Sequence, residues 1–241
     1  MSEQLSFDLP ARAALERDDF FISPSNALAV ALIDAPQSWS NGKLLLIGPE
    51  GAGKTHLAHV WAAQCGAQII SAADLKESAV PDLLRTPVVV EDVDGIAGDR
   101  ALETVLFHLH NLASAENQPL LMSARRAPQR WPLALPDLAS RLQAIQIAQL
   151  DPPDDTLLSA VLMKLFADRQ LMPAPDVIPF LALRIDRSFA AAQNTVSALD
   201  KAGLDAKRPL TRAFVSSMLD KISPQDPIST HAEKTEVSDA S

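Results

Sequence analysis

The sequence of 241 residues predicts an α/β fold, in which a P-loop core with a parallel sheet is followed by a small all-α lid domain. Short apolar runs of strand length alternate with longer segments of helical pattern in the first part of the chain. That alternation is typical of parallel strands whose two faces are covered by crossover helices. A glycine-rich loop directly follows the first of these strands, and the strand-like runs stop after Asp151-Pro152-Pro153.

The core is expected to span residues 18–150, after a flexible segment at 1–17. The turn Ser23–Asn26 is expected to open a short apolar helix that runs to Ile33. Four strands are predicted from apolar runs at 44–47, 68–70, 88–90 and 120–122, and two long helices from the patterns at 54–64 and 101–116.

The lid is expected to span residues 151–222. Four helices are predicted near 154–169, 175–185, 188–202 and 211–221, the last of them capped by Thr211. Residues 223–241 contain almost no bulky apolar side chains, so we expect a disordered tail.

Composition excludes several classes of function. The single cysteine, Cys65, rules out a disulfide framework and a cysteine-rich metal site. A net charge of -9 argues against direct binding to duplex DNA, because affinity for phosphate depends on clustered lysine and arginine. No apolar run approaches the roughly 18 residues that a membrane helix needs, and we expect a cytoplasmic protein.

The strongest motif is GPEGAGKT at 48–55, which fits GxxxxGK[ST] between a strand and a helix. Backbone N–H groups of such a loop surround phosphate oxygens, the lysine reaches the terminal phosphates, and the Thr55 hydroxyl binds Mg²⁺. His56 and His59 lie one turn apart, but no third metal ligand accompanies them. The residues expected to bind ADP or ATP are Gly48, Gly51, Ala52, Gly53, Lys54, Thr55 and His56.

A second motif, VVVEDVDGIAGD at 88–99, ends an apolar strand in carboxylates. Beside a phosphate loop, one carboxylate is expected to bind Mg²⁺ and the next to orient the attacking water. Glu91 and Asp92 are the favoured pair, although spacing also allows Asp94. Ser123 ends another strand, where its side chain could lie against the terminal phosphate.

The segment PDLASRLQ places Arg141 just before the lid. At that place an arginine can reach the nucleotide of a neighbouring subunit. On the residues alone, a surface arginine is the favoured interpretation.

Taken in this order, the motifs resemble the DnaA branch of the AAA+ ATPases over roughly residues 18 to 222. The matching features are FxxxPSNxLA at 20–29, GKTHLAH at 53–59, an acidic pair followed by IAGD at 96–99, LASR at 138–141, and the helical lid. Within that branch, the chain is similar to the regulatory Hda-like members. We expect neither the DNA-binding domain that follows the lid in DnaA proteins nor the domain that precedes their ATPase core.

The resemblance implies two partners. In Hda-like proteins a short N-terminal peptide binds the DNA polymerase sliding clamp, and Gln4, Leu5, Phe7 and Leu9 match its pattern. The glutamine amide would bond at the rim of an apolar pocket while the three apolar side chains bury surface. Arg141 matches the arginine finger that acts in trans on ATP bound to DnaA, which would place the protein at the replisome through the clamp. A homodimer is also possible.

Two departures from the family pattern imply weak ATPase activity at the chain's own site. Glu91 occupies the usual aspartate position of the magnesium-binding strand. The lid position expected to carry a sensor arginine is Ala190, and Arg184 or Arg187 could substitute for it. The alternative function is a helicase-loading or DNA-associated adaptor that hydrolyses its own nucleotide. A small-molecule kinase ranks below both.

Overall fold

The computed structural model describes residues 21–206 and 209–222. Five parallel strands form one sheet in the order β2-β3-β4-β1-β5. The strands are β1 (Lys43–Ile47), β2 (Gln68–Ser71), β3 (Val88–Glu91), β4 (Leu120–Ala124) and β5 (Gln146–Gln149). Because all strands are parallel, their carboxyl ends lie along one edge of the sheet, where ligand sites of open α/β sheets form.

Helices cover both faces of this sheet. Alternate residues of β1 face opposite sides, so that Leu44 and Leu46 pack with α1 (Ala27–Ile33) and α2 (Lys54–Cys65). Leu45 and Ile47 join the core on the other face. That face is covered by α3 (Val80–Leu83), α4 (Arg100–Ala115) and α5 (Pro136–Gln143).

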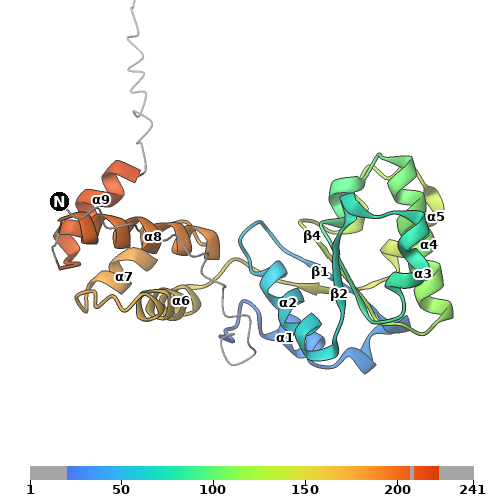
Figure 1. Ribbon diagram of the computed structural model, residues 1–241, viewed down its shortest axis with the longest axis horizontal. Helices are drawn as coiled ribbons and strands as arrows, with labels where there is room; N and C mark the ends of the chain where they lie inside the picture. The colour runs from blue at the N-terminus through green and yellow to red at the C-terminus, as the bar shows by residue number, and fades with distance from the viewer. Residues whose placement is uncertain (1–20, 207–208, 223–241) are drawn as a thin grey trace, which may run out of the picture.

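The remaining helices form a group of their own beside the sheet, shown from yellow to red in Figure 1. They are α6 (Asp155–Asp168), α7 (Val177–Ala182), α8 (Phe189–Ala206) and α9 (Arg212–Ile222). Their apolar side chains form a separate core around Leu162, Phe166 and Val196. The Asp154 carboxylate caps α6 by accepting from the Leu157 N–H. This hydrogen bond is the main reason that the pKa of Asp154 lies below its usual range.

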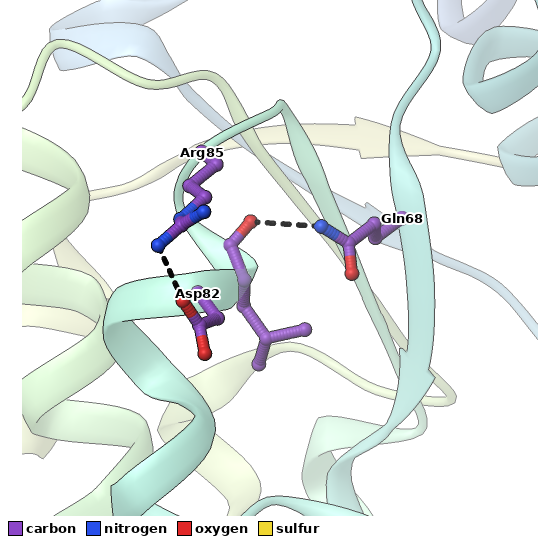
Figure 2. Close-up of polar contacts among 4 residues, drawn as sticks. Gln68, Asp82 and Arg85 are labelled. Carbon is purple, nitrogen blue, oxygen red and sulfur yellow. Dashed lines mark hydrogen bonds and ion pairs between the residues drawn. The ribbon is translucent and has the colours of Figure 1, made fainter.

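A small polar cluster joins the edge strand β2 to α3 (Figure 2). The Gln68 side-chain amide donates to Thr86 Oγ1 at 3.1 Å and, more weakly, to the Leu83 carbonyl at 3.5 Å. Arg85 pairs with Asp82 at 3.0 Å, but both side chains are mostly exposed, so the pair contributes little stability.

The structure confirms the predicted fold class and the four predicted strands. It adds β5 and α5, which the sequence analysis did not identify. β5 reads QIAQ and lies at the sheet edge, with Ala148 as its single fully buried residue, so it lacks the apolar run that marked the other strands. Among the described residues, no helix is long and apolar enough to cross a membrane.

Candidate functional site

The glycine-rich loop leaves β1 after Ile47 and enters α2 at Lys54. Gly51 has φ +75° and Gly53 has φ +93°, a backbone region that favours glycine. A β-carbon on Gly51 would lie 2.4 Å from the Ser188 β-carbon at the start of the lid helix α8. The glycine is therefore required both for the turn of the loop and for the close approach of the lid.

The Lys54 ammonium is held inside this loop. Its Nζ donates to the Gly48 carbonyl at 2.8 Å and to the Pro49 carbonyl at 2.9 Å. Burial lowers the pKa of Lys54, while the nearby carboxylates of Asp92 and Asp94 act in the opposite direction. The amine is therefore positioned at the centre of the loop, next to the acidic end of β3.

The other loop residues lie around it. Gly48 packs against Leu150, the residue that follows β5, since a β-carbon on Gly48 would lie 2.5 Å from the Leu150 carbonyl oxygen. Ala52 is buried. Thr55 is exposed in the first turn of α2, followed by the half-buried His56. The Thr55 hydroxyl is thus accessible to a ligand at the loop.

The acidic residues that follow β3 differ in their partners. Glu91 is the last strand residue, and its Oε1 is buried with no hydrogen-bond partner in the structure. Asp92 is exposed and has φ +56°. Asp94 is half-buried, and its carboxylate accepts the Arg125 N–H at 3.1 Å. Asp94 thus has a structural partner, whereas Glu91 and Asp92 retain free carboxylate oxygens.

Ser123 lies on β4 and is buried. Its Oγ accepts the Asp92 N–H at 3.1 Å, which fixes the backbone of Asp92 in its unusual conformation. The hydroxyl hydrogen of Ser123 is not used by that bond. The structure therefore brings Lys54, Asp92 and Ser123 together at the carboxyl edge of the sheet.

The lid contacts the loop directly through residues that the sequence analysis missed. The Phe189 N–H donates to the Gly51 carbonyl at 3.0 Å, and a β-carbon on Gly53 would lie 2.6 Å from the Phe189 ring. Ser188 caps α8 by accepting the Ala191 N–H. Neither residue type signals a loop contact, because the two segments lie far apart in the sequence.

The two lid arginines considered for sensing phosphate have other contacts. Arg187 pairs with Asp155 at 2.7 Å, and the Arg184 guanidinium lies over the Phe180 ring at 4.8 Å. Ala190, in the first turn of α8, offers no charge. In this structure both arginines are therefore engaged with partners inside the group of helices α6 to α8.

Arg141 lies at the other end of the sheet. It is exposed on α5, and its charge helps to lower the pKa of the buried Lys43, which begins β1. At about 3.3 Å per strand residue, the length of β1 separates this end from the phosphate loop by roughly 13 Å. Figure 1 shows α5 on the side of the sheet far from the lid.

A buried carboxylate positions the start of α5. Glu103 on α4 is fully buried and accepts backbone N–H groups from Gly98 at 2.7 Å, Ala134 at 3.0 Å and Leu135 at 2.7 Å. Asp99 caps α4 by accepting from the Ala101 and Leu102 N–H groups. The IAGD segment therefore has a structural role, and the one sequence signal for Glu103 was a charge on the apolar face of a helix.

The described residues do not hold a metal ion by themselves, since no group of three or more His, Cys, Asp or Glu side chains gathers among them. Gln4, Leu5, Phe7 and Leu9 lie outside the described residues, as does the tail from 223.

No protein-family model matches the sequence. The structure is similar to domain III of the replication initiation protein DnaA from Thermotoga maritima, with a TM-score of 0.75 and 18% identity over 88% of this chain and 98% of that one. AMPPCP-bound DnaA from Aquifex aeolicus matches with a TM-score of 0.63 and 19% identity, over 77% of this chain and 64% of that one. A RuvB variant from Thermotoga maritima matches with a TM-score of 0.64 and 20% identity, over 83% of this chain and 68% of that one.

These similarities define the class of fold. The five-stranded parallel sheet with its helices is an AAA+ fold of the DnaA type. The chain spans about two thirds of the length of the longer Aquifex DnaA structure.

Proposed function

We propose that this chain is an Hda-like regulator of replication initiation, which stimulates hydrolysis of ATP bound to DnaA. The observation that carries the proposal is the position of Arg141. It is exposed at the opposite end of β1 from its own phosphate loop, and none of the described carboxylates pairs with it. This exposure and the separation from its own phosphate loop support a role of Arg141 on the nucleotide of a partner molecule.

The chain's own phosphate loop fits a nucleotide. Lys54 is already held at its centre, and the loop glycines permit the curvature that turns N–H groups toward phosphate oxygens. Mg²⁺ would be held by the Thr55 hydroxyl and by Glu91, whose buried oxygen lacks a partner. When bound, the ion neutralises charge on the phosphates.

Nucleotide at this loop would serve mainly to fix the lid. The N–H of Phe189 bonds to the loop, so any ligand that orders the loop also biases the orientation of α8. Asp92 and Ser123 are the residues that could support slow hydrolysis here, but the lid contributes no charge through Ala190. We therefore propose weak ATPase activity of the chain's own.

Arg141 would act on DnaA-bound ATP as an arginine finger. A guanidinium that reaches the transferring phosphoryl group stabilises its developing charge, which contributes roughly 10³ to 10⁵ in rate. Glu103 holds the start of α5 and so helps to fix the direction in which Arg141 is presented.

The clamp would be bound by the N-terminal peptide. This part of the proposal rests only on the sequence pattern of Gln4, Leu5, Phe7 and Leu9. Docking on a clamp loaded on DNA would concentrate the protein where DnaA has to be inactivated.

The test is hydrolysis of radiolabelled ATP preloaded on DnaA, in the presence of DNA-loaded clamp. We expect stimulation by the full chain and little stimulation by a version that lacks residues 1–10. A matched control replaces Gln4 and Leu5 by alanine in the full chain, and it should behave like the deletion. Absence of stimulation by the full chain contradicts the regulator.

The adaptor remains the second candidate, because the structure is also similar to a DnaA that was bound to AMPPCP and single-stranded DNA. Tight binding of this chain to single-stranded DNA, together with hydrolysis of its own nucleotide, would favour the adaptor.

A further inference from the structure

The lid carries two arginines over one aromatic ring. Phe180 lies on α7 and is 8% exposed. The Arg184 guanidinium lies 4.8 Å from the centre of this ring, and the guanidinium of Arg212, the first residue of α9, lies 4.9 Å from it. Because both distances start from one ring centre, the two guanidinium groups are at most about 10 Å apart. The end of α7 and the start of α9 therefore present a cation pair, Arg184 and Arg212.

The cation pair keeps its capacity to bind an anion. Among the described residues, no carboxylate forms an ion pair with either arginine, whereas Arg187 pairs with Asp155 at 2.7 Å. A guanidinium that covers a ring with its face still has its N–H donors in its own plane, where an oxygen can accept from them. Leu183, directly before Arg184, is 77% exposed. The surface thus combines two cations with an apolar side chain.

The chemistry of this surface favours a protein segment over a nucleic acid. Two guanidinium groups bind carboxylates through charge-assisted hydrogen bonds. Binding of single-stranded nucleic acid relies on exposed aromatic faces, but the Phe180 ring is buried under the cation pair. A net charge of -9 also opposes a polyanion. The matching ligand is an acidic peptide that has an apolar residue next to a carboxylate.

Such a segment follows α9 in this chain. Residues 223–241 contain four carboxylate side chains and one lysine. Glu233 and Glu236 stand three residues apart, a span of at most about 11 Å in an extended chain. This span matches the separation of the cation pair, so that each glutamate can meet one guanidinium. Val237 directly follows Glu236 and supplies an apolar side chain for Leu183.

The segment is also long enough to return to the start of α9. This helix has 11 residues, which at 1.5 Å per residue gives a length of about 16 Å. Glu233 stands eleven residues beyond Ile222, a reach of at least about 36 Å when extended. Asp226 stands only four residues beyond Ile222 and spans at most about 14 Å, which is less than the length of the helix.

We propose that Glu233 and Glu236 of the segment 223–241 bind the cation pair, Arg184 and Arg212, of the same chain. The short connection keeps the two glutamates at a high effective concentration near the pair, on the millimolar scale that is typical of short flexible linkers. The consequence is an occupied surface on the lid: an acidic segment of another protein has to displace the chain's own segment before it can bind there.

The experiment places a nitroxide spin label on the full chain at Thr235→Cys, between the two glutamates, with Cys65→Ser to remove the exposed natural thiol. In amide spectra, the signals at the end of α7 and the start of α9 should lose most of their intensity, whereas those of α4 in the core should keep it. Raising the salt to about 1 M, where the Debye length is about 3 Å, should restore the lost intensity.

Two variants of the labelled chain locate the contact. Glu233→Gln/Glu236→Gln should restore the signals of α7 and α9, because the charges that meet the cation pair are removed. Asp226→Asn is the matched control, and the loss of intensity should persist in it. Arg184→Ala/Arg212→Ala should act like the glutamate variant.

Retained signals of α7 and α9 in the labelled wild-type chain would overturn the inference, as would an equal loss in the wild type and Glu233→Gln/Glu236→Gln. The glutamate changes leave Phe180 and both arginines in place, so their effect cannot come from a loss of packing between α7 and α9. None of these measurements uses nucleotide, clamp or DnaA. The inference therefore fails or holds independently of the proposed function.

Discussion

One buried lysine begins strand β1 and another follows the loop at its far end, and the surroundings of the two lysines differ. Lys54 follows the carboxyl end, where loop carbonyls and the carboxylates of Asp92 and Asp94 surround its amine. Lys43 begins the amino end, where its Nζ donates to Ser114 Oγ and to the Asn41 carbonyl. Its charged neighbour there is Arg141, which lowers its pKa further than burial alone.

The difference indicates two different uses of positive charge. At the carboxyl end, cations and carboxylates are interleaved around a loop that fits phosphate and a metal ion. At the amino end, Lys43, His110 and Arg141 approach one another with no described carboxylate in an ion pair with them. The first end fits a ligand of its own. Under the proposed function, the exposed Arg141 at the second end would meet an anion carried by another molecule.

The largest expected effect is that of replacing Arg141, which should change the activity on DnaA-bound ATP without changing nucleotide binding at the Lys54 loop. Arg141→Ala should reduce stimulation of DnaA-bound ATP hydrolysis by about 10³, because the finger's charge is lost. The dissociation constant of this chain for ADP should stay within about twofold. Initial hydrolysis rates and calorimetry measure the two quantities. A matched Arg100→Ala variant, also exposed, should retain full stimulation.

Lys54→Ala should have the reverse effect and weaken binding of ADP and ATP by about 10-fold to 100-fold, since a charge-assisted contact with phosphate is removed. The control is Lys43→Met, which removes the equivalent charge from the other end of the same strand. Equal losses of nucleotide affinity in both variants would contradict the division between the two ends.

Glu103→Gln should lower the free energy of unfolding by about 2 to 3 kcal/mol. The change removes charge from an acceptor of three backbone N–H groups and turns an amide NH₂ toward one of them. Urea unfolding followed by circular dichroism measures the loss. The exposed Glu116→Gln variant should change stability by less than about 0.5 kcal/mol. A loss no larger than that of the control would show that Glu103 does not fix α5.

The smallest expected effect is a pH dependence at the amino end. Burial, with Lys43 and Arg141 adding to it, lowers the pKa of His110 from 6.5 to about 4. The folded protein therefore binds fewer protons than the unfolded chain between these values, and stability is full above pH 6.5 and lost as the pH falls toward 4. Between pH 7 and pH 5 this loss is about 1 to 2 kcal/mol.

His110→Gln should remove that part of the acid sensitivity, whereas the exposed His108→Gln on the same helix should retain it. Urea unfolding of the three proteins at pH 7 and pH 5 provides the comparison. The same pH dependence in wild type and His110→Gln would exclude His110 as its source.

How much of this could be predicted from the sequence depends on whether a feature is local. The strands around Leu45, Val89 and Leu121 were predicted because residues buried on both faces of a sheet read as continuous apolar runs. The phosphate loop was predicted because the residues that define its motif are consecutive in the sequence. β5 was missed because only two apolar residues, Ile147 and Ala148, stand between two glutamines, which is too short a run to indicate a strand.

The contacts that link distant segments could not be predicted. The packing of Phe189 on Gly53, the bonds of Glu103 to the start of α5, and the bond of the Asp92 N–H to Ser123 each join residues from separate elements. Sequence spacing also left Asp94 as an alternative to the acidic pair. Its bond to the Arg125 N–H now gives Asp94 a structural partner.

The most direct test of the division between the two ends follows the fate of two separate labels. In one reaction γ-labelled ATP is preloaded on DnaA, in the other it is preloaded on this chain, and both contain the same proteins and DNA-loaded clamp. We predict rapid release of phosphate from the DnaA-bound label and slow release from the label on this chain. Release from the chain's own nucleotide at an equal or higher rate, with the DnaA-bound label unaffected, would contradict the regulator and favour the adaptor.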